Sequence, residues 1–279
     1  EVLTITRSAR GDGEVEWDPV AGRLDHRALE GTDAVVHLAG EPIGAARWTS
    51  RVRARIRRSR VDGTALIAGT LARLDAPPRV LVSGSAVGYY GDGGDRELDE
   101  SSPAGDDFLA SVCVEWERAA GPARSAGIRV VHPRTGVVLA RGGPLIDKVE
   151  LPFRLGVGGR IGSGRQYVPW IALDDHVRAL RHLVDVEVEG PVNLVAPTAA
   201  TNRALTAALG AVFRRPTVLP IPVAAIRLLY GEMGASLASV SQRVVPRVLQ
   251  ESGFTFRLDE LHAALDAVLG PEARTTDGG

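Results

Sequence analysis

The sequence predicts an α/β protein built on a doubly wound parallel sheet, because short apolar segments alternate with longer amphipathic ones. The chain has 279 residues, of which 44% are hydrophobic and 24% charged, enough for one large domain with a smaller appendage. From about Thr201 the alternation gives way to helices separated by prolines. We therefore expect a sheet domain followed by a smaller, mostly helical part.

The expected strands are short and rich in branched apolar residues, at 2–6, 34–38, 80–83 and 128–131. Amphipathic segments between them predict helices at 48–74 and 106–120, the second with acidic residues at its start. A glycine-rich loop at 156–164 precedes an extended segment, a helix from Asp174 and a last helix after Asp259. The predicted division is a domain of residues 1–190 with an excursion at 141–172, a C-terminal substrate part at 191–270, and a frayed tail at 271–279.

Composition excludes several classes of protein. The formal net charge of −1 gives no overall attraction to nucleic acid or to anionic membranes. The arginine-rich run at 51–60 keeps one apolar edge, so we interpret it as a solvated helix face. Cys113 is the single cysteine, no His/Cys cluster has metal-ligand spacing, and no apolar run approaches the roughly 20 residues that span a bilayer. We expect a cytoplasmic protein without a metal, whose partner is a small molecule.

Five motifs carry a resemblance to a known family: VVHLAGEPI (35–43), SGSAVGYYG (83–91), DFLASVCVEWE (107–117), PRTGVVLA (133–140) and VPWIALDDHVRAL (168–180). Their order resembles the extended short-chain dehydrogenase/reductases, and more narrowly the epimerase-family proteins with a small helical C-terminal extension. The resemblance implies a Rossmann-like fold, a nicotinamide dinucleotide and a carbonyl or sugar-like substrate, with nucleotide sugars among the candidates.

Arg7 ends the first expected strand, where enzymes that prefer NAD place a carboxylate for the ribose hydroxyls. A guanidinium can instead bind two oxygens of a 2′-phosphate, so the sequence favours NADP. The alternative is a solvated arginine at a strand end. The resemblance assigns further residues to the cofactor, namely Asp18, Leu38, Ala39, Gly40, Ser83 and Pro133. We interpret His37 as a partly buried histidine held by hydrogen bonds, in preference to a catalytic role.

The same resemblance makes Ser85, Tyr89 and Tyr90 the candidate catalytic residues, with Ser85 in the place of the hydroxyl that binds the reacting oxygen. The superfamily has Tyr and Lys four residues apart on the next helix, so that the ammonium lowers the pKa of the phenol. Here those positions are interpreted as Phe108 and Val112, neither of which transfers a proton. The single lysine, Lys148, lies on a later segment.

For the substrate, the resemblance suggests Arg134 beside the nicotinamide, and Arg165 in a loop at 158–166 that suits a lid over an anion. Trp170 completes the crevice that we expect between the sheet domain and the C-terminal part. Asp174 and Asp175 are interpreted as caps of a helix N-terminus. Two functions stay open: an NADP-dependent oxidoreductase or epimerase with a non-standard site, and an inactive NADP-binding regulatory or scaffold protein.

The first part of a dinucleotide site is missing from the order of predicted elements. Such a site needs a strand, a glycine-rich turn and a helix ahead of the strand that carries the ribose-binding residue, and none precedes Val2. We expect these elements upstream, in roughly 25 to 30 residues. The alternative is a fold in which the segment from Val2 is the true first strand.

A sheet buried on both faces loses backbone partners on two sides when its central strand is absent. Each orphaned buried group costs about 1 to 3 kcal/mol, and several such losses exceed the net stability of about 5 to 15 kcal/mol of a typical domain. The chain Glu1–Gly279 is therefore expected not to fold alone. Thermal unfolding of that chain tests this expectation, and a cooperative transition with NADP binding would contradict it.

Overall fold

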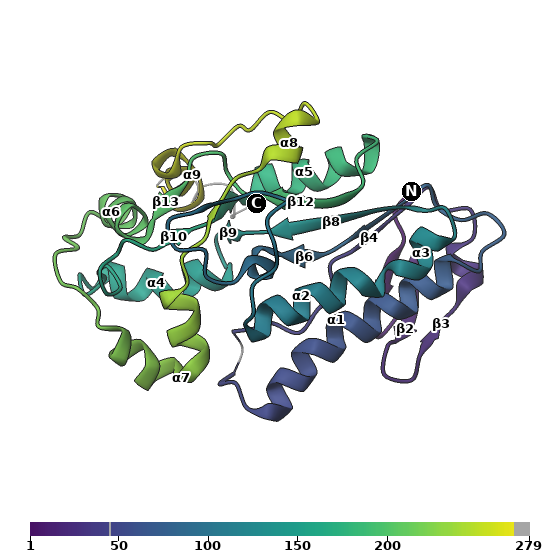
Figure 1. The fold of residues 1–279 in the computed structure, drawn as a ribbon, viewed down its shortest axis with the longest axis horizontal. Coiled ribbons are helices and arrows are strands. Elements are labelled where there is room, and N and C mark those ends of the chain that lie inside the picture. Colours follow the sequence, from purple (N-terminus) through teal and green to yellow (C-terminus); the bar gives the residue numbers. More distant parts are fainter. Residues whose placement is uncertain (45, 271–279) are drawn as a thin grey trace.

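The computed structural model describes residues 1–44 and 46–270. Its centre is a parallel sheet in the order β12-β8-β5-β4, with β6 also paired to β8 (Figure 1). The strands are β4 (Ala34–His37), β5 (Val80–Ser83), β6 (Ser85–Ala86), β8 (Arg129–Thr135) and β12 (Gly190–Leu194). The predicted fold class, an α/β protein with a Rossmann-like doubly wound sheet, is confirmed.

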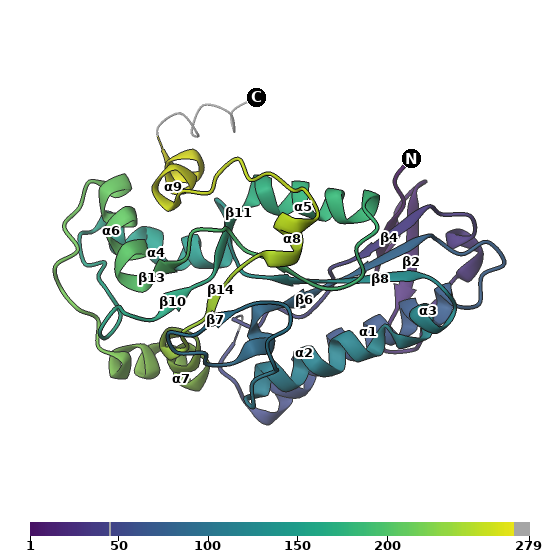
Figure 2. The same cartoon turned by 45° about the horizontal axis from the view of Figure 1, so that its top comes forward.

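Helices cover both faces of this sheet, as Figure 2 shows. On one face lie α1 (Ser50–Leu71), α2 (Phe108–Ala119) and α3 (Gly121–Ser125); on the other lie α5 (Leu173–Asp185) and α8 (Arg247–Glu251). Successive residues of β5 serve the two layers: Leu81 packs with Ile67 and Leu71 of α1, whereas Val80 and Val82 pack with Leu183 of α5. This period of two makes β5 the wall between two apolar cores.

A small second sheet stands beside the first. It contains β1 (Thr4–Thr6), β2 (Glu14–Asp18) and β3 (Arg23–Leu24), with β1 and β2 parallel and β2 and β3 antiparallel. A 3-10 turn at His26–Leu29 leads from it to β4. Within the described residues β4 pairs with β5 alone. Val36 of β4 is 47% exposed, and Leu38, which follows β4, is 49% exposed.

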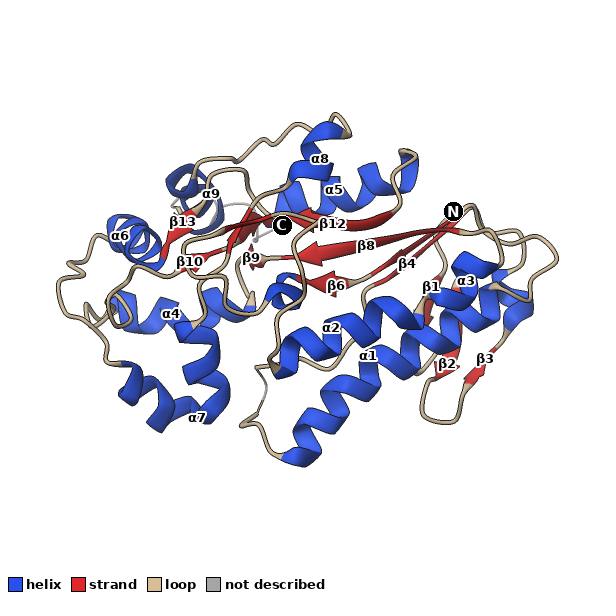
Figure 3. Cartoon of the chain, viewed as in Figure 1, coloured by secondary structure: helices blue, strands red, loops and turns tan. Residues whose placement is uncertain are grey.

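The other end of the molecule has its own apolar core, formed mainly by α4 (Pro144–Arg154), α6 (Asn202–Phe213) and α9 (Leu261–Leu269) (Figure 3). The strands β9 (Val137–Leu139), β10 (Tyr167–Val168), β11 (Trp170–Ala172) and β13 (Ala200–Thr201) join this end to the sheet. The remaining elements are the 3-10 turn η2 (Val87–Tyr90), α7 (Val223–Ser239), and the paired strands β7 (Glu97–Leu98) and β14 (Arg243–Val244).

The sequence placed the start of the C-terminal part at residue 191, and this boundary needs correction. β12 pairs along its whole length with β8, from Gly190 opposite Val131 to Leu194 opposite Thr135, and is therefore a strand of the main sheet. The tail predicted at 271–279 lies outside the described residues. Within the described part of the chain, no helix is long and apolar enough to cross a membrane, and no cluster of His, Cys, Asp and Glu could hold a metal.

His37 provides a stability test. Burial lowers its pKa from 6.5 to about 4, and its Nε2 has no hydrogen-bond partner in the described structure. Between these pH values the unfolded chain binds a proton that the folded chain does not, so the free energy of unfolding falls as the pH is lowered through this window. The loss attributable to His37 is at most about 3 kcal/mol.

We expect His37→Leu to reduce the change in unfolding free energy, measured with urea, between pH 7 and about pH 4.5. His132, His176 and Glu100 still contribute to the pH dependence, because burial lowers the pKa values of the two histidines and raises that of Glu100. His26→Gln, at an exposed site, is the matched control and should leave the pH dependence unchanged. An identical pH dependence in His37→Leu and the wild type would contradict this interpretation.

Candidate active site

The carboxyl ends of β4, β5, β6 and β8 meet at one edge of the sheet. The register places His37 beside Ser83 and Ser85 beside Arg134. Because these strands are parallel, the segment Leu38–Gly40 and the Ser85 hydroxyl group lie at the same edge. Ligands of open α/β sheets bind in the crevice outside this edge. The structure thus brings the predicted cofactor segment and the predicted catalytic serine to one side of the molecule.

Behind this edge, Arg134 of β8 forms a buried ion pair with Glu117 of α2. Nε of Arg134 donates to Oε1 of Glu117 over 2.8 Å, and Nη2 donates to Oε2 over 3.0 Å. The Arg134 side chain is 3% exposed and that of Glu117 is 14% exposed. Burial disfavours the charged guanidinium, but the bonds with Glu117 and Tyr90 outweigh it and raise the pKa of Arg134 above its usual value. A bidentate pair of this kind is what makes a buried arginine tolerable.

Ser85 completes this group from β6. Its Oγ donates to Oε1 of Glu117 over 2.7 Å, so this carboxylate oxygen accepts bonds from both Ser85 and Arg134. Sequence reasoning missed Glu117, although it closes the motif DFLASVCVEWE. A signal was available in the sequence: Glu117 is an acidic residue at the end of an apolar helix stripe. Arg134 follows a buried strand and needs a partner, because an unpaired buried charge is costly.

Tyr90 is held in the same network. Nη1 of Arg134 donates to the Tyr90 hydroxyl over 3.0 Å, and that hydroxyl donates to Oδ1 of Asn193 over 2.7 Å. Tyr90 is 3% exposed, and burial raises its pKa to about 12. Tyr89 is half-buried, and its ring centroid lies 3.4 Å from Cζ of Arg134. Tyr90 therefore holds the network in place, and Tyr89 is the phenol that reaches the surface.

Residues from the C-terminal half of the chain hold η2, the turn that carries Tyr89 and Tyr90. Nε2 of Gln242 donates to the carbonyl oxygens of Val87 and Gly91. Oε1 of Glu100 accepts bonds from the backbone N–H groups of Asn193 and Val248. Burial raises the pKa of Glu100. The segment around β14 and α8 thereby locks η2, which carries both tyrosines.

The face of α2 that meets the serine strand differs from the one expected. A Cβ placed on Gly88 would lie 3.4 Å from Cβ of Leu109 and 3.9 Å from Sγ of Cys113, and Glu117 continues this stripe to Ser85. Phe108 instead packs edge-on against Trp48, with ring centroids 5.3 Å apart. The residues of α2 that face the site are thus Leu109 and Cys113, each one position after Phe108 and Val112 in the sequence. They include neither Tyr nor Lys, and burial raises the pKa of Cys113 to about 12.

The cofactor side of the edge has an exposed glycine, Gly40, and an adjacent cation. A Cβ on Gly40 would lie 3.1 Å from Cζ of Arg60, whose Nη1 donates to the carbonyl oxygen of Glu41 over 2.9 Å. The guanidinium also lies 5.0 Å from the ring centroid of Trp116. The expectation that residues 51–60 are a solvated face is therefore wrong for Arg60. A dinucleotide fits this edge, because Gly40 admits close approach and Arg60 supplies charge for a phosphate.

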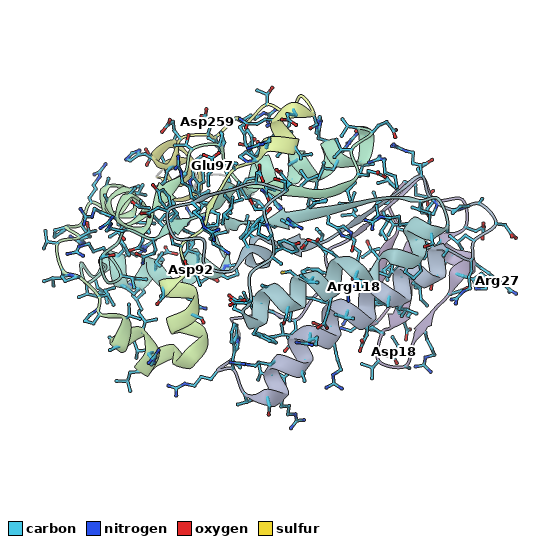
Figure 4. All side chains as sticks on the ribbon, viewed as in Figure 1. Asp18, Arg27, Asp92, Glu97, Arg118 and Asp259 are labelled. Atoms are coloured by element: carbon cyan, nitrogen blue, oxygen red, sulfur yellow. The ribbon has the colours of Figure 1, made fainter. Side chains whose placement is uncertain are left out.

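The other predicted cofactor residues are dispersed. Arg7 is exposed directly after β1, and Ser83 and Pro133 are buried inside the sheet. The carboxylate of Asp18 accepts bonds from the N–H groups of Val20 and Ala21 and pairs with Arg23, which stabilises the turn from β2 to β3. Figure 4 shows Asp18 far from Asp92, which lines the first of the two cavities described next.

The three predicted substrate residues are not brought together. Arg165 is exposed and lines two adjoining cavities of about 430 and 460 Å³. Neither is lined by Arg134 or by Trp170, which is 2% exposed and donates from Nε1 to the carbonyl oxygen of Thr198. The second cavity adds Arg203 and Arg243. This end of the molecule therefore gathers three guanidinium groups around one hollow.

Asp175 also differs from expectation. Its buried carboxylate pairs with Arg178 over 2.6 Å and accepts bonds from the backbone N–H groups of Arg257 and Leu258. It thus fastens the segment before α9 to α5 instead of capping its own helix.

Comparison with known proteins identifies the family. The model of a domain of unknown function, DUF1731, matches residues 221–268. The epimerase family protein Mb2239 of Mycobacterium bovis is 41% identical over 95% of this chain and 88% of its own length. The human epimerase family protein SDR39U1 is 37% identical over 96% of this chain and 91% of its own. The chain belongs to this epimerase family.

Solved structures agree with this assignment. Human SDR39U1 (isoform 2), crystallised with NADPH, superposes with a TM-score of 0.88 at 36% identity, covering 97% of this chain and 91% of that one. A nucleoside-diphosphate sugar epimerase from Corynebacterium glutamicum gives a TM-score of 0.76 at 35% identity, covering 99% of this chain and 55% of that one. The resemblance seen in the five motifs is confirmed, including the helical C-terminal extension that DUF1731 covers.

Proposed function

We propose that this epimerase-family protein is an NADP(H)-dependent oxidoreductase or epimerase acting on a carbonyl or sugar-like substrate, and that it works in the cytosol. The observation that carries the proposal is the Ser85 hydroxyl, held by a buried ion pair at the sheet edge where Leu38–Gly40 leave an open backbone. The NADPH bound to the human relative supports the choice of cofactor.

In this function the chain's own residues bind and orient. Arg7 and Arg60 supply cations for the phosphates of the cofactor, and Gly40 admits its close approach. NADP supplies the hydride chemistry when bound. Ser85 contacts the reacting oxygen of the substrate, with Tyr89 beside it. Arg134 and Glu117 keep Ser85 in place.

Nucleotide sugars are the first substrate class to test. Arg165, Arg203 and Arg243 line one cavity together with a single carboxylate, that of Asp95, and guanidinium groups suit phosphate oxygens. The name of the Corynebacterium glutamicum relative points to the same class. Turnover of NADP(H) with a panel of carbonyls, alcohols and nucleotide sugars is the decisive assay.

One observation favours the second function, an NADP-binding protein without turnover. The face of α2 toward Ser85 carries Leu109 and Cys113 in place of a proton-transferring Tyr/Lys pair. Cofactor binding without oxidation or reduction of any compound in the panel would favour this alternative.

The cofactor preference has its own test. We expect NADPH to bind more tightly than NADH, because Arg7 offers a cation where a carboxylate would repel a 2′-phosphate. Arg7→Ala should weaken NADPH binding by about 1.5 to 3 kcal/mol and leave NADH binding unchanged. Calorimetry on the full-length protein measures both affinities, and Arg10→Ala is the control on the same exposed segment. Equal affinities for the two cofactors in the wild type would refute this assignment.

A further inference from the structure

We propose that Glu117 holds the proton of Ser85, so that Ser85 Oγ faces the substrate as a proton acceptor and Glu117 receives the proton behind it. The inference rests on the proposed function for its substrate step. It assigns to Ser85 and Glu117 the acid–base work that the missing Tyr/Lys pair would perform. Its starting point is the 2.7 Å hydrogen bond between Ser85 Oγ and Glu117 Oε1.

The direction of this bond follows from its neighbours. The pKa of Arg134 is raised by its bonds with Glu117 and Tyr90, and this guanidinium donates to both oxygens of Glu117, so both oxygens act as acceptors. The bond must therefore run from the Ser85 hydroxyl to the carboxylate. A serine hydroxyl has one proton and two lone pairs, so committing the proton to Glu117 leaves lone pairs for a partner outside the network. Such a serine accepts a hydrogen bond from a substrate hydroxyl.

Ser85 and Glu117 keep some exposed surface. Ser85 is 5% exposed and the Glu117 side chain 14%, whereas Arg134 and Tyr90 are each 3% exposed. Ser85 begins β6, two residues after the end of β5, at the edge beside Leu38–Gly40. Both members of the pair are thus less buried than Arg134 and Tyr90, and Ser85 lies at the edge where a substrate would bind.

The other titratable side chains nearby contact groups outside the Ser85–Glu117 pair. The Tyr90 proton goes to Asn193, and burial raises the pKa of Tyr90 to about 12. The ring nitrogens of His132 contact the carbonyl oxygen of Ser83 and the guanidinium of Arg124. His37 faces Trp17, with ring centroids 5.8 Å apart. Tyr89 is the phenol that competes with Ser85 for the role, and the experiment below includes it.

In the oxidation of a substrate alcohol, Ser85 and Glu117 take up the hydroxyl proton and the nicotinamide takes up the hydride. The C–H bond breaks, and hydride leaves with its electron pair for the oxidised nicotinamide. The O–H bond of the alcohol breaks, its proton forms a new bond to Ser85 Oγ, and the original Ser85 proton moves to Oε1 of Glu117. The products are a carbonyl compound, NADPH and a protonated Glu117, which returns its proton to solvent. Carbonyl reduction is the reverse.

The hydrogen-bond direction can be tested without cofactor or substrate. In Ser85→Cys, the S–H stretch in the infrared reports whether the side chain at position 85 donates. We expect this band at lower frequency than the band of Cys113, whose Sγ lies 3.7 Å from the carbonyl oxygen of Ala86. Adding Glu117→Gln should move the new band back toward that of Cys113, because an amide oxygen accepts more weakly than a carboxylate. A new band that Glu117→Gln leaves unmoved would overturn the proposal.

The proton transfer is tested on the alcohol or carbonyl of the panel that the wild type turns over fastest. Ser85→Ala and Glu117→Gln should each lower kcat at least about 100-fold, with the double variant no worse than either single one. Glu117→Asp should restore part of the activity, because it keeps a carboxylate that can accept the Ser85 proton. NADPH binding and thermal unfolding identify any variant that fails to fold.

Two outcomes would contradict the proposal: retention of kcat in Glu117→Gln, or a larger loss of kcat in Tyr89→Phe than in Ser85→Ala. If the wild type turns over no compound in the panel, the proposed function fails. The infrared result still decides whether Glu117 holds the Ser85 proton.

Discussion

The ion pair between Arg134 and Glu117 is the interaction on which the site depends. Arg134 lies in the middle of the sheet and reaches α2 through Glu117, η2 through Tyr90, and β12 through the bond from Tyr90 to Asn193. Elements far apart in the sequence thus share one buried cation. Removing one partner of such a pair leaves an unpaired buried charge and typically costs about 3 to 5 kcal/mol. The position of Ser85 depends on the same carboxylate.

The C-terminal part acts on this site through backbone bonds. Gln242 holds the turn that carries the two tyrosines, and Glu100 joins β12 to the start of α8. Asp175 binds the segment that leads into α9. The region matched by DUF1731 is therefore part of the frame of the candidate active site as well as one wall of the arginine-lined cavity. Changes there are expected to reach Ser85 through η2.

The sequence predicted the sheet because its strands carry apolar residues with clear boundaries. The motifs at strand ends pointed to Ser85 and Arg134, but Arg134 was assigned to the substrate, whereas the structure buries it against Glu117. The sequence misplaced the rotation of α2, because Phe108 and Val112 form an apolar stripe as acceptable as Leu109 and Cys113, and one residue turns a helix by about 100°. Arg60 and Glu117 were missed for a related reason: charge partners lie on distant segments, and only the fold brings them together. Trp170 was expected at the substrate, but its size and indole N–H also suit a core position bonded to Thr198.

A double-mutant cycle on Glu117 and Arg134 tests the central claim most directly. The variants are Glu117→Leu, Arg134→Leu and their combination, and urea denaturation gives the free energy of unfolding of each. We predict that each single change destabilises the fold by about 3 to 5 kcal/mol and that the double change costs less than the sum of the two, because it leaves no unpaired buried charge. Additive effects within about 0.5 kcal/mol would mean that the two side chains act independently and would contradict the account.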